Sequence, residues 1–205
     1  MDVARPISAV SPSLEGEVLQ TLAGTSMAMT GRQVAVLTGR SSHSGVLDAL
    51  GRLTKQGLVD RVELNRASLF SLNREHLAAP AVIALAGLRA ELVARIRGDI
   101  AVWEVAPIHA SLFGSAARGD GDTRSDIDLF VVRPADLLED EGCWRAQLDR
   151  LTAKIERWTG NRASISEVSE PEIARLGSNP PPIVAQLRSD AILLGGQPLT
   201  DLFRD

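Results

Sequence analysis

The sequence predicts an α+β fold, because the period of its hydrophobic residues changes along the chain. From Ser13 to Gly57 apolar side chains recur at helical spacing, and from Leu58 to Leu72 they alternate with polar ones, which predicts helices followed by a β-hairpin. A long helical pattern comes next, and after it short apolar runs predict a second set of strands, at residues 108–113, 127–132 and 162–169.

These patterns divide the chain into two expected domains. The first covers residues 1–78, and the second covers residues 79–205 and begins with a linking helix over 79–103. The linking helix has a broad apolar stripe, which fits packing on the second sheet and equally fits the interface of a homodimer. A further helix is expected over Asp136–Thr159, ended by Gly160.

Composition excludes several classes of protein. No apolar run approaches the roughly 20 residues of a membrane span, and the first residues lack a charged segment followed by an apolar one. We therefore expect a soluble, cytoplasmic protein without a membrane partner. Cys143 is the single cysteine, so a disulfide within the chain and a zinc site built on cysteines are excluded.

The N-terminal domain has clear helix boundaries. Its predicted helices run from Ser13 to Gly24, from Gly31 to Leu37 behind Thr30, and from Ser41 or Ser42 to Gly57. Three helices and a hairpin within about seventy residues resemble a winged helix-turn-helix domain of the bacterial regulator type. The resemblance implies DNA contacts near the start of the third helix and on the hairpin, namely Arg40, Ser42, His43, Ser44, Arg61 and Arg66. The alternative is a module for protein interaction or dimerisation, with these basic residues solvated.

The segment from residue 107 to residue 133 carries the candidate chemistry. An apolar strand ends at Gly114-Ser115, and a second strand is entered through Asp126 and Asp128. Side chains alternate along a strand, so the two aspartates share one face, about 7 Å apart at a rise of about 3.3 Å per residue. Such a pair is suited to a divalent cation that also binds phosphate oxygens.

The glycine supplies the other half of this predicted site. Gly114 allows a sharp turn close to a ligand, and the amides that follow it, with the Ser115 hydroxyl, are donors for phosphate. The alternative is a surface hairpin in which these polar side chains are ordinary turn residues. That alternative leaves two acids unexplained at the start of an apolar strand, where carboxylates without partners are unfavourable.

Gly114-Ser115-Ala-Ala-Arg118-Gly119-Asp120 followed by Ser125-Asp126-Ile-Asp128-Leu129 resembles the signature of the DNA polymerase β-like nucleotidyltransferase superfamily in its minimal form. The resemblance implies a small mixed sheet with helices on one face, and attack of an acceptor on the α-phosphate of a nucleoside triphosphate, with ATP as the expected nucleotide. It assigns Mg²⁺, or Mn²⁺ in its place, to Asp126 and Asp128. It assigns the nucleotide to Gly114, Ser115, Arg118 and Ser125. Arg118 has an alternative role in a surface ion pair with Asp120 or Asp122.

One position departs from the family's pattern. The family usually has a third carboxylate on the later strand, and here that strand contains only Glu167, which alternation places on the wrong face unless a bulge turns it. With such a bulge, Glu167 is the expected third metal ligand beside Asp126 and Asp128. Two functions therefore remain open. One is an enzyme that transfers a nucleotide, with AMP expected, to an unidentified acceptor, which is a protein, a small molecule or a nucleic acid. Minimal members of the superfamily often belong to toxin-antitoxin pairs, which implies a partner protein. The other is a transcription regulator that senses nucleotide through a degenerate domain.

Overall fold

The computed structural model describes residues 1–39, 42–64, 67–139, 141–176 and 182–202. It divides into two compact units, one made of Asp2 and Ala4–Leu88 and the other of Met1, Val3 and Arg89–Asp205. We call them the N-terminal unit and the C-terminal unit and describe each by itself. The described helices include none with the length and apolar character that a membrane crossing requires.

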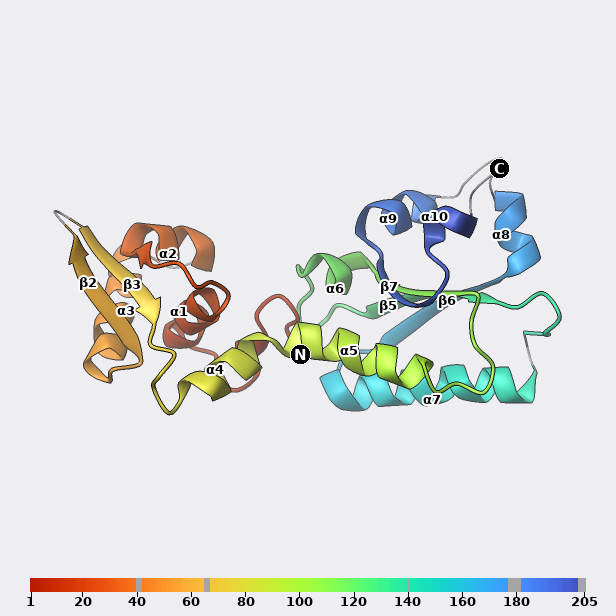
Figure 1. The fold of residues 1–205 in the computed structure, drawn as a ribbon, viewed down its shortest axis with the longest axis horizontal. Coiled ribbons are helices and arrows are strands. Elements are labelled where there is room, and N and C mark those ends of the chain that lie inside the picture. Colours follow the sequence, from red (N-terminus) through yellow and green to blue (C-terminus); the bar gives the residue numbers. More distant parts are fainter. Residues whose placement is uncertain (40–41, 65–66, 140, 177–181, 203–205) are drawn as a thin grey trace. The chain divides into compact units, whose positions relative to one another are not determined.

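The N-terminal unit contains helices around a small antiparallel sheet of strand order β1-β3-β2 (Figure 1). Its elements are η1 (Pro6–Ala9), α1 (Leu14–Ala23), β1 (Met29–Thr30), α2 (Gly31–Thr38), α3 (His43–Lys55), β2 (Val59–Leu64), β3 (Ala67–Leu72) and α4 (Ala79–Ala86). The predicted helix starts are confirmed, because Ser13, Thr30 and Ser42 each accept a hydrogen bond from a backbone N–H of the first turn. The predicted hairpin is β2 and β3.

The predicted linking helix is two helices, and this corrects the expected domain boundary. α4 ends before Gly87, and α5 (Leu88–Ile100) follows. Ala79 and Val82 of α4 pack in the core of the N-terminal unit, whereas Leu92 and Ile96 of α5 pack in the core of the C-terminal unit. The division therefore falls between residues 88 and 89 rather than after residue 78, because burial assigns each half of the pattern to a different core.

The C-terminal unit is built on a four-stranded mixed sheet of order β6-β5-β4-β7. β5 pairs in parallel with β6 and antiparallel with β4, and β4 pairs antiparallel with β7. The elements after α5 are β4 (His109–Phe113), α6 (Gly114–Arg118), β5 (Ile127–Arg133), α7 (Gly142–Thr159), β6 (Ala163–Ser169), α8 (Glu170–Leu176), α9 (Pro182–Asp190), β7 (Ile192–Gly196) and α10 (Leu199–Leu202). The three predicted strands are confirmed.

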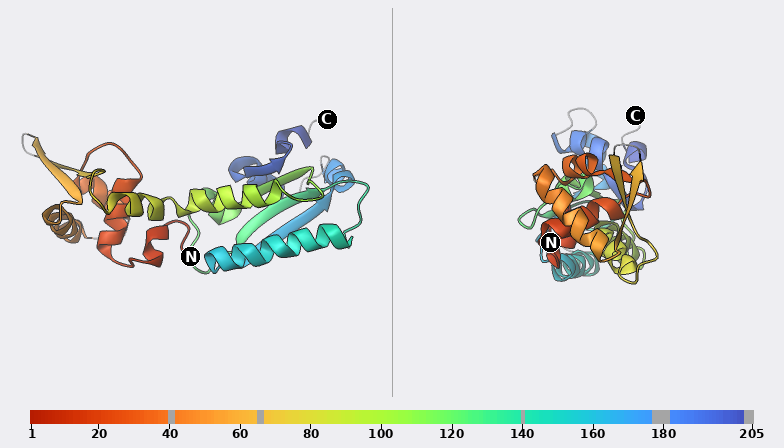
Figure 2. Two further views of the ribbon diagram at one scale, coloured as in Figure 1. Left: turned by 60° about the horizontal axis from the view of Figure 1, so that its bottom comes forward. Right: turned by 90° about the vertical axis from the view of Figure 1, so that its left-hand side faces the viewer.

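Helices cover both faces of this sheet, so the expectation of helices on one face is wrong (Figures 1 and 2). On one face, alternate strand residues such as Leu112 and Leu129 pack against α5 and α7. On the other face, Phe113 and Phe130 pack with Ile173 of α8 and with α9. Both faces of the central strands are therefore largely buried, which is why β5 is an almost continuous hydrophobic run after Asp128.

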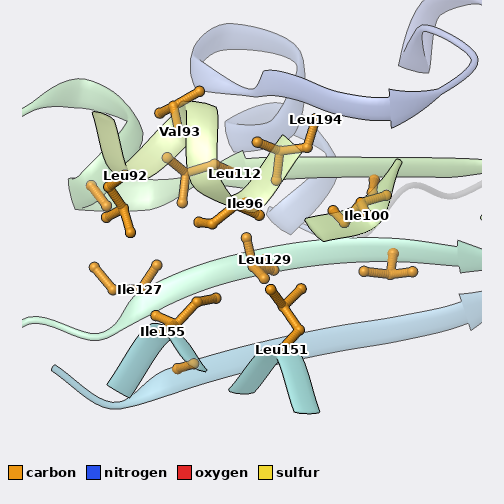
Figure 3. Close-up of a cluster of buried hydrophobic side chains, with 14 of the residues drawn as sticks. Leu92, Val93, Ile96, Ile100, Leu112, Ile127, Leu129, Leu151, Ile155 and Leu194 are labelled. Carbon is orange, nitrogen blue, oxygen red and sulfur yellow. The ribbon is translucent and has the colours of Figure 1, made fainter. Parts of the chain in front are cut away.

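The larger of the two cores lies between the sheet and the pair α5 and α7. Figure 3 shows side chains of α5, of β4 and β5 and of α7 directed toward one another in this layer. The labelled members are Leu92, Val93, Ile96, Ile100, Leu112, Ile127, Leu129, Leu151, Ile155 and Leu194. Such a core holds the register of β4 against β5, because a slip by one residue would exchange the buried sides of a strand.

The helix expected from Asp136 begins later, at Gly142. The preceding residues form turns, and the side chain of Leu138 is 70% exposed. Leu137 and Leu138 therefore lie outside the helix, and its core-facing side is formed by Trp144, Leu148 and Leu151.

A buried ion pair joins the far end of β5 to β6 beneath α7. Arg133 Nε donates to Glu167 Oε1 at 2.8 Å, and Trp144 Nε1 donates to the same oxygen at 2.8 Å. The side chains of the arginine and the glutamate are only 10% and 11% exposed. Removal of one partner from such a pair leaves an uncompensated charge, which is more costly than the pair itself is favourable.

We predict that Glu167→Ala lowers the free energy of unfolding by about 3 kcal/mol, because Arg133 and the Trp144 N–H lose their acceptor in a buried place. Urea denaturation of the full chain measures the change. Glu156→Ala, at an exposed position of α7, is the control and should change stability by less than about 0.5 kcal/mol. Equal effects of the two substitutions would contradict the structural role given to Glu167.

Candidate functional site

The backbone of Gly114 lies directly against the carboxylate of Asp128. Phe113, the last residue of β4, is the register partner of Asp128 in β5, so the turn after β4 begins beside this carboxylate. A Cβ built on Gly114 would lie 2.7 Å from Asp128 Oδ2, closer than Cβ atoms are found to other atoms. Gly114 also has φ +69°, a conformation that other residues rarely adopt. The structure thus brings together the two halves of the site that the sequence predicts.

Asp126 and Asp128 are close enough to affect one another. Both side chains are half-buried at the start of β5. Burial raises the pKa of the Asp128 carboxyl, the negative charge of Asp126 raises that pKa further, and the positive charge of Arg118 opposes both. Two like charges that lose solvation together are unfavourable on their own, and a bound cation would relieve this repulsion.

The two aspartates fit a divalent cation. Within the described part of the chain, neither carboxylate has a hydrogen bond or an ion pair with a protein group, although each is half-buried. Carboxylate oxygens are the ligands that Mg²⁺ prefers, and Mg²⁺ usually takes only one or two of them from the protein. No group of three or more His, Cys, Asp or Glu side chains is arranged for a metal among the described residues. Asp126 and Asp128 therefore form the protein side of the candidate cation site.

Serines rather than acids face the aspartate from β6. β6 pairs with β5 so that Ser164 is the partner of Asp128 and Ser166 the partner of Phe130, which puts both serines on the face of the aspartate. Glu167 pairs with Val131 on the opposite face, where Arg133 and Trp144 bind its carboxylate. No bulge interrupts this ladder. Glu167 is therefore not placed to join Asp126 and Asp128, which corrects its assignment as a metal ligand.

Ser115 and Arg118 lie on the short helix α6 that follows the Gly114 turn. The Ser115 side chain is half-buried, and its carbonyl oxygen accepts the N–H groups of Gly119 and Asp120 that end the helix. Arg118 is exposed, and its guanidinium donates to Asp120 at 3.0 Å and to Asp190 at 3.0 Å. Both carboxylates raise the pKa of Arg118. Arg118 therefore makes surface ion pairs in this structure. The pair with Asp120 agrees with the alternative role predicted from the sequence, and the second partner is Asp190 rather than Asp122.

Ser125 holds the loop before β5 in shape. Its hydroxyl donates to Asp122 Oδ1 at 3.2 Å and accepts the Asp122 N–H at 2.9 Å. Asn161, buried after α7, donates to the carbonyl oxygens of Asp122 and Ser125 at 3.1 and 2.9 Å. These contacts position the backbone that leads into Asp126, so Ser125 acts on the loop rather than pointing a free hydroxyl at a ligand.

Two positioning residues escaped the sequence prediction. Asn161 lies more than thirty residues after the loop that it holds, and the only local signal is its place after Gly160 at the end of a helix. Arg89 of α5 donates its Nε to the carbonyl oxygen of Ala116 at 2.9 Å and also bonds that of Ala117. The arginine thereby satisfies the last carbonyl groups of α6, which a short helix leaves without internal partners.

The residues expected to bind DNA are only partly described. Arg40 and Arg66 lie outside the described residues. Ser42, His43 and Ser44 are exposed at the first turn of α3, although the Ser42 hydroxyl also caps the helix. Arg61 on β2 forms an ion pair with Glu63 at 2.5 Å and lies over the ring of Phe70.

Comparisons with known proteins bear on the C-terminal unit. Residues 99–175 match the model of the nucleotidyltransferase domain family, and this stretch includes Gly114, Asp126 and Asp128. No curated protein matches the chain. Among solved structures, a chain from the "Crystal structure of the toxin-antitoxin with AMP-PNP" is similar at 19% identity over 55% of this chain and 76% of that chain, with a TM-score of 0.33. That likeness is too slight to support an argument. The C-terminal unit thus carries a nucleotidyltransferase domain match over the residues of the candidate site.

Proposed function

We propose that the C-terminal unit transfers a nucleotide from a metal-bound nucleoside triphosphate to an acceptor. The observation that supports this most directly is the packing of Gly114 against the Asp128 carboxylate, with Asp126 beside it. Nucleotidyltransferase domains generally use divalent metal ions, and the family match covers these three residues. We assign Mg²⁺ or Mn²⁺ to the two aspartates and ATP as the nucleotide.

The proposed reaction is an in-line displacement. A hydroxyl of the acceptor attacks the α-phosphorus and loses its proton to solvent, the bond from that phosphorus to the oxygen bridging the α- and β-phosphates breaks, and pyrophosphate leaves. A divalent cation would supply charge neutralisation on the phosphate oxygens. Asp126 and Asp128 would hold this cation, and the Gly114 turn would let the phosphates approach the backbone closely. Asn161 and Arg89 keep the loop and α6 in position.

A second function is favoured by a different observation. Ser164 stands opposite Asp128 where the family usually has an acid, and three polar side chains are exposed at the start of α3. A nucleotide-sensing transcription regulator would need only nucleotide binding in one unit and DNA binding in the other. We propose that the N-terminal unit is a winged helix, because its three helices are followed along the chain by a β-hairpin.

We predict that Asp128→Asn reduces nucleotide transfer at least about 100-fold, because a carboxylate that holds the cation loses its charge. The measurement is release of pyrophosphate, and of label from an α-labelled triphosphate, with Mg²⁺ and a panel of acceptors. Asp149→Asn is the control, since Asp149 is 61% exposed on α7 and pairs with Arg145. Transfer that survives in Asp128→Asn would remove the enzymatic assignment.

We predict that Gly114→Ala weakens binding of Mg²⁺-ATP about tenfold or more. The added methyl group meets Asp128 Oδ2, and the positive φ adds a penalty of about 1 to 2 kcal/mol. Calorimetric titration measures the affinity. Gly142→Ala is the matched control, because nothing lies within 4 Å of a Cβ at Gly142. If the Gly114→Ala and Gly142→Ala proteins bind the nucleotide equally well, the Gly114 turn is not part of the nucleotide site.

The regulator hypothesis predicts DNA binding by the full chain that weakens steeply with salt and changes when nucleotide is added. Ser44→Glu should weaken it several-fold, because Ser44 is exposed in the first turn of α3 and the new charge would face phosphates. Gln56→Glu, at the other end of α3, makes the same charge change as a control. Fluorescence anisotropy with a labelled duplex is the measurement, and absence of binding at low salt would exclude this function.

A further inference from the structure

The outer strand of the small sheet in the N-terminal unit has a free edge. β2 pairs with β3 on one side, and no described strand lies on its other side (Figure 1). The carbonyl oxygen of Leu58 accepts a hydrogen bond from the N–H of Asn73, so the trans peptide group after Leu58 turns its own N–H away from β3. By alternation, the N–H and C=O groups of Val59, Arg61 and Glu63 face the free edge, where they have no backbone partner among the described residues. Such a row of groups is a template for a further strand.

Two apolar side chains of β2 are exposed beside this edge. Val62 and Leu64 are each 57% exposed. They lie on the face of β2 that is turned away from the core, because Val59 on the opposite face is buried. Leu69 of β3 is the register partner of Val62, so these two side chains form an apolar pair on the outer face. A free edge that also presents apolar side chains favours pairing with another strand.

The charges of β2 indicate which strand that is. When two copies of one strand pair antiparallel about a two-fold axis, the residue at the axis lies opposite itself. A register centred on Asp60, Arg61 or Glu63 would therefore place like charges opposite one another.

The register centred on Val62 avoids this repulsion. In that register Arg61 of each copy lies opposite Glu63 of the other copy, so opposite charges meet twice. The backbone groups of both residues face the free edge, as a hydrogen-bonded pair of an antiparallel ladder requires. The edge of β2 is thus complementary in charge and in hydrogen bonding to a second copy of itself.

We infer that β2 pairs with β2 of a second copy of this chain, antiparallel and centred on Val62. The pairing joins the two three-stranded sheets into one and sets Val62 and Leu69 of both copies in a single apolar row on the outer face. Within one copy Arg61 already forms an ion pair with Glu63, and the dimer gives each of these charges a second opposite neighbour. The surface lies wholly in the N-terminal unit, so the inference does not depend on the proposed transfer of a nucleotide.

The first measurement is the oligomeric state of the full chain without nucleotide. Analytical ultracentrifugation from about 1 μM to about 200 μM should show monomer and dimer in equilibrium, with a dissociation constant in the micromolar range because one strand edge is a small interface. A chain that stays monomeric over this whole range would overturn the inference. The edge would then be left to a different protein or to solvent.

Charge reversal tests the register. Arg61→Glu puts glutamates opposite one another at both charged pairs, and Glu63→Arg puts arginines there, so each variant should dimerise about tenfold more weakly or worse. Both side chains are exposed, at 50% and 62%, which makes the substitutions tolerable for folding. An equimolar mixture of the two variants should dimerise about as well as the unmodified chain, because every arginine again meets a glutamate across the interface. A mixture that associates no better than the separate variants would refute the register.

The matched control for these charge changes is the exposed ion pair of Arg95 and Glu91 on α5. Arg95→Glu and Glu91→Arg make the same two changes at side chains that are each 52% exposed. Each should dimerise like the unmodified chain, and mixing them should change nothing. If mixing these control variants restores or strengthens association as mixing the β2 variants does, general attraction of opposite charges explains the result and the inference fails.

A change at the axis tests the place of contact. Val62→Lys sets two positive charges opposite one another and should abolish the dimer over the same concentrations. Val36→Lys, at a side chain that is 72% exposed on α2, makes the same change in the same unit and should leave the dimer intact. A dimer that survives Val62→Lys, or that is lost equally in both variants, forms through another surface and contradicts the pairing of β2.

Discussion

The contact between the Gly114 backbone and the Asp128 carboxylate is the constraint on which the candidate site depends. It requires a residue without a Cβ, a positive φ, and the register that sets Phe113 opposite Asp128. The register in turn depends on the cores on the two faces of the sheet, since a shift of one residue would move Leu112 and Leu129 out of the layer under α5 and α7. The geometry of the site is thus a consequence of packing over the whole unit.

Because both sheet faces are buried, each polar side chain in the strands needs a partner or a ligand. On the face with α8 and α9, the polar side chains of β4 and β5 are Asp128, His109 and Ser111, set among Phe113 and Phe130. His109 and Ser111 are buried and are hydrogen-bonded to one another. Among the described residues Asp128 has no hydrogen bond or ion pair, and its pKa is raised by burial and by the negative charge of Asp126. The buried pair of His109 and Ser111 therefore needs no ligand, whereas the Asp128 carboxylate is suited to a cation.

The residues that support the site come from distant parts of the chain, and this limits what a local pattern can predict. The loop before Asp126 is held by Asn161, which follows α7, and α6 is held by Arg89 from α5. Arg118 and Ser125 look like ligand-binding residues in the sequence, yet their side chains make an ion pair and a turn. Partners of these kinds are chosen by tertiary contacts, because many residues of the same type would serve locally.

The sequence by itself determined most of the order of the elements and the helix caps, because these follow from spacing and local hydrogen bonding. Spacing also predicted that Asp126 and Asp128 lie close together, and the charge of Asp126 does raise the pKa of Asp128. Alternation along β6 also indicated that Glu167 points away from the aspartates. Only the tertiary structure decided that helices cover both faces, that α4 and α5 belong to different cores, and that Arg133 and Trp144 hold Glu167. Those outcomes depend on which distant side chains meet, and burial across the sheet selects them.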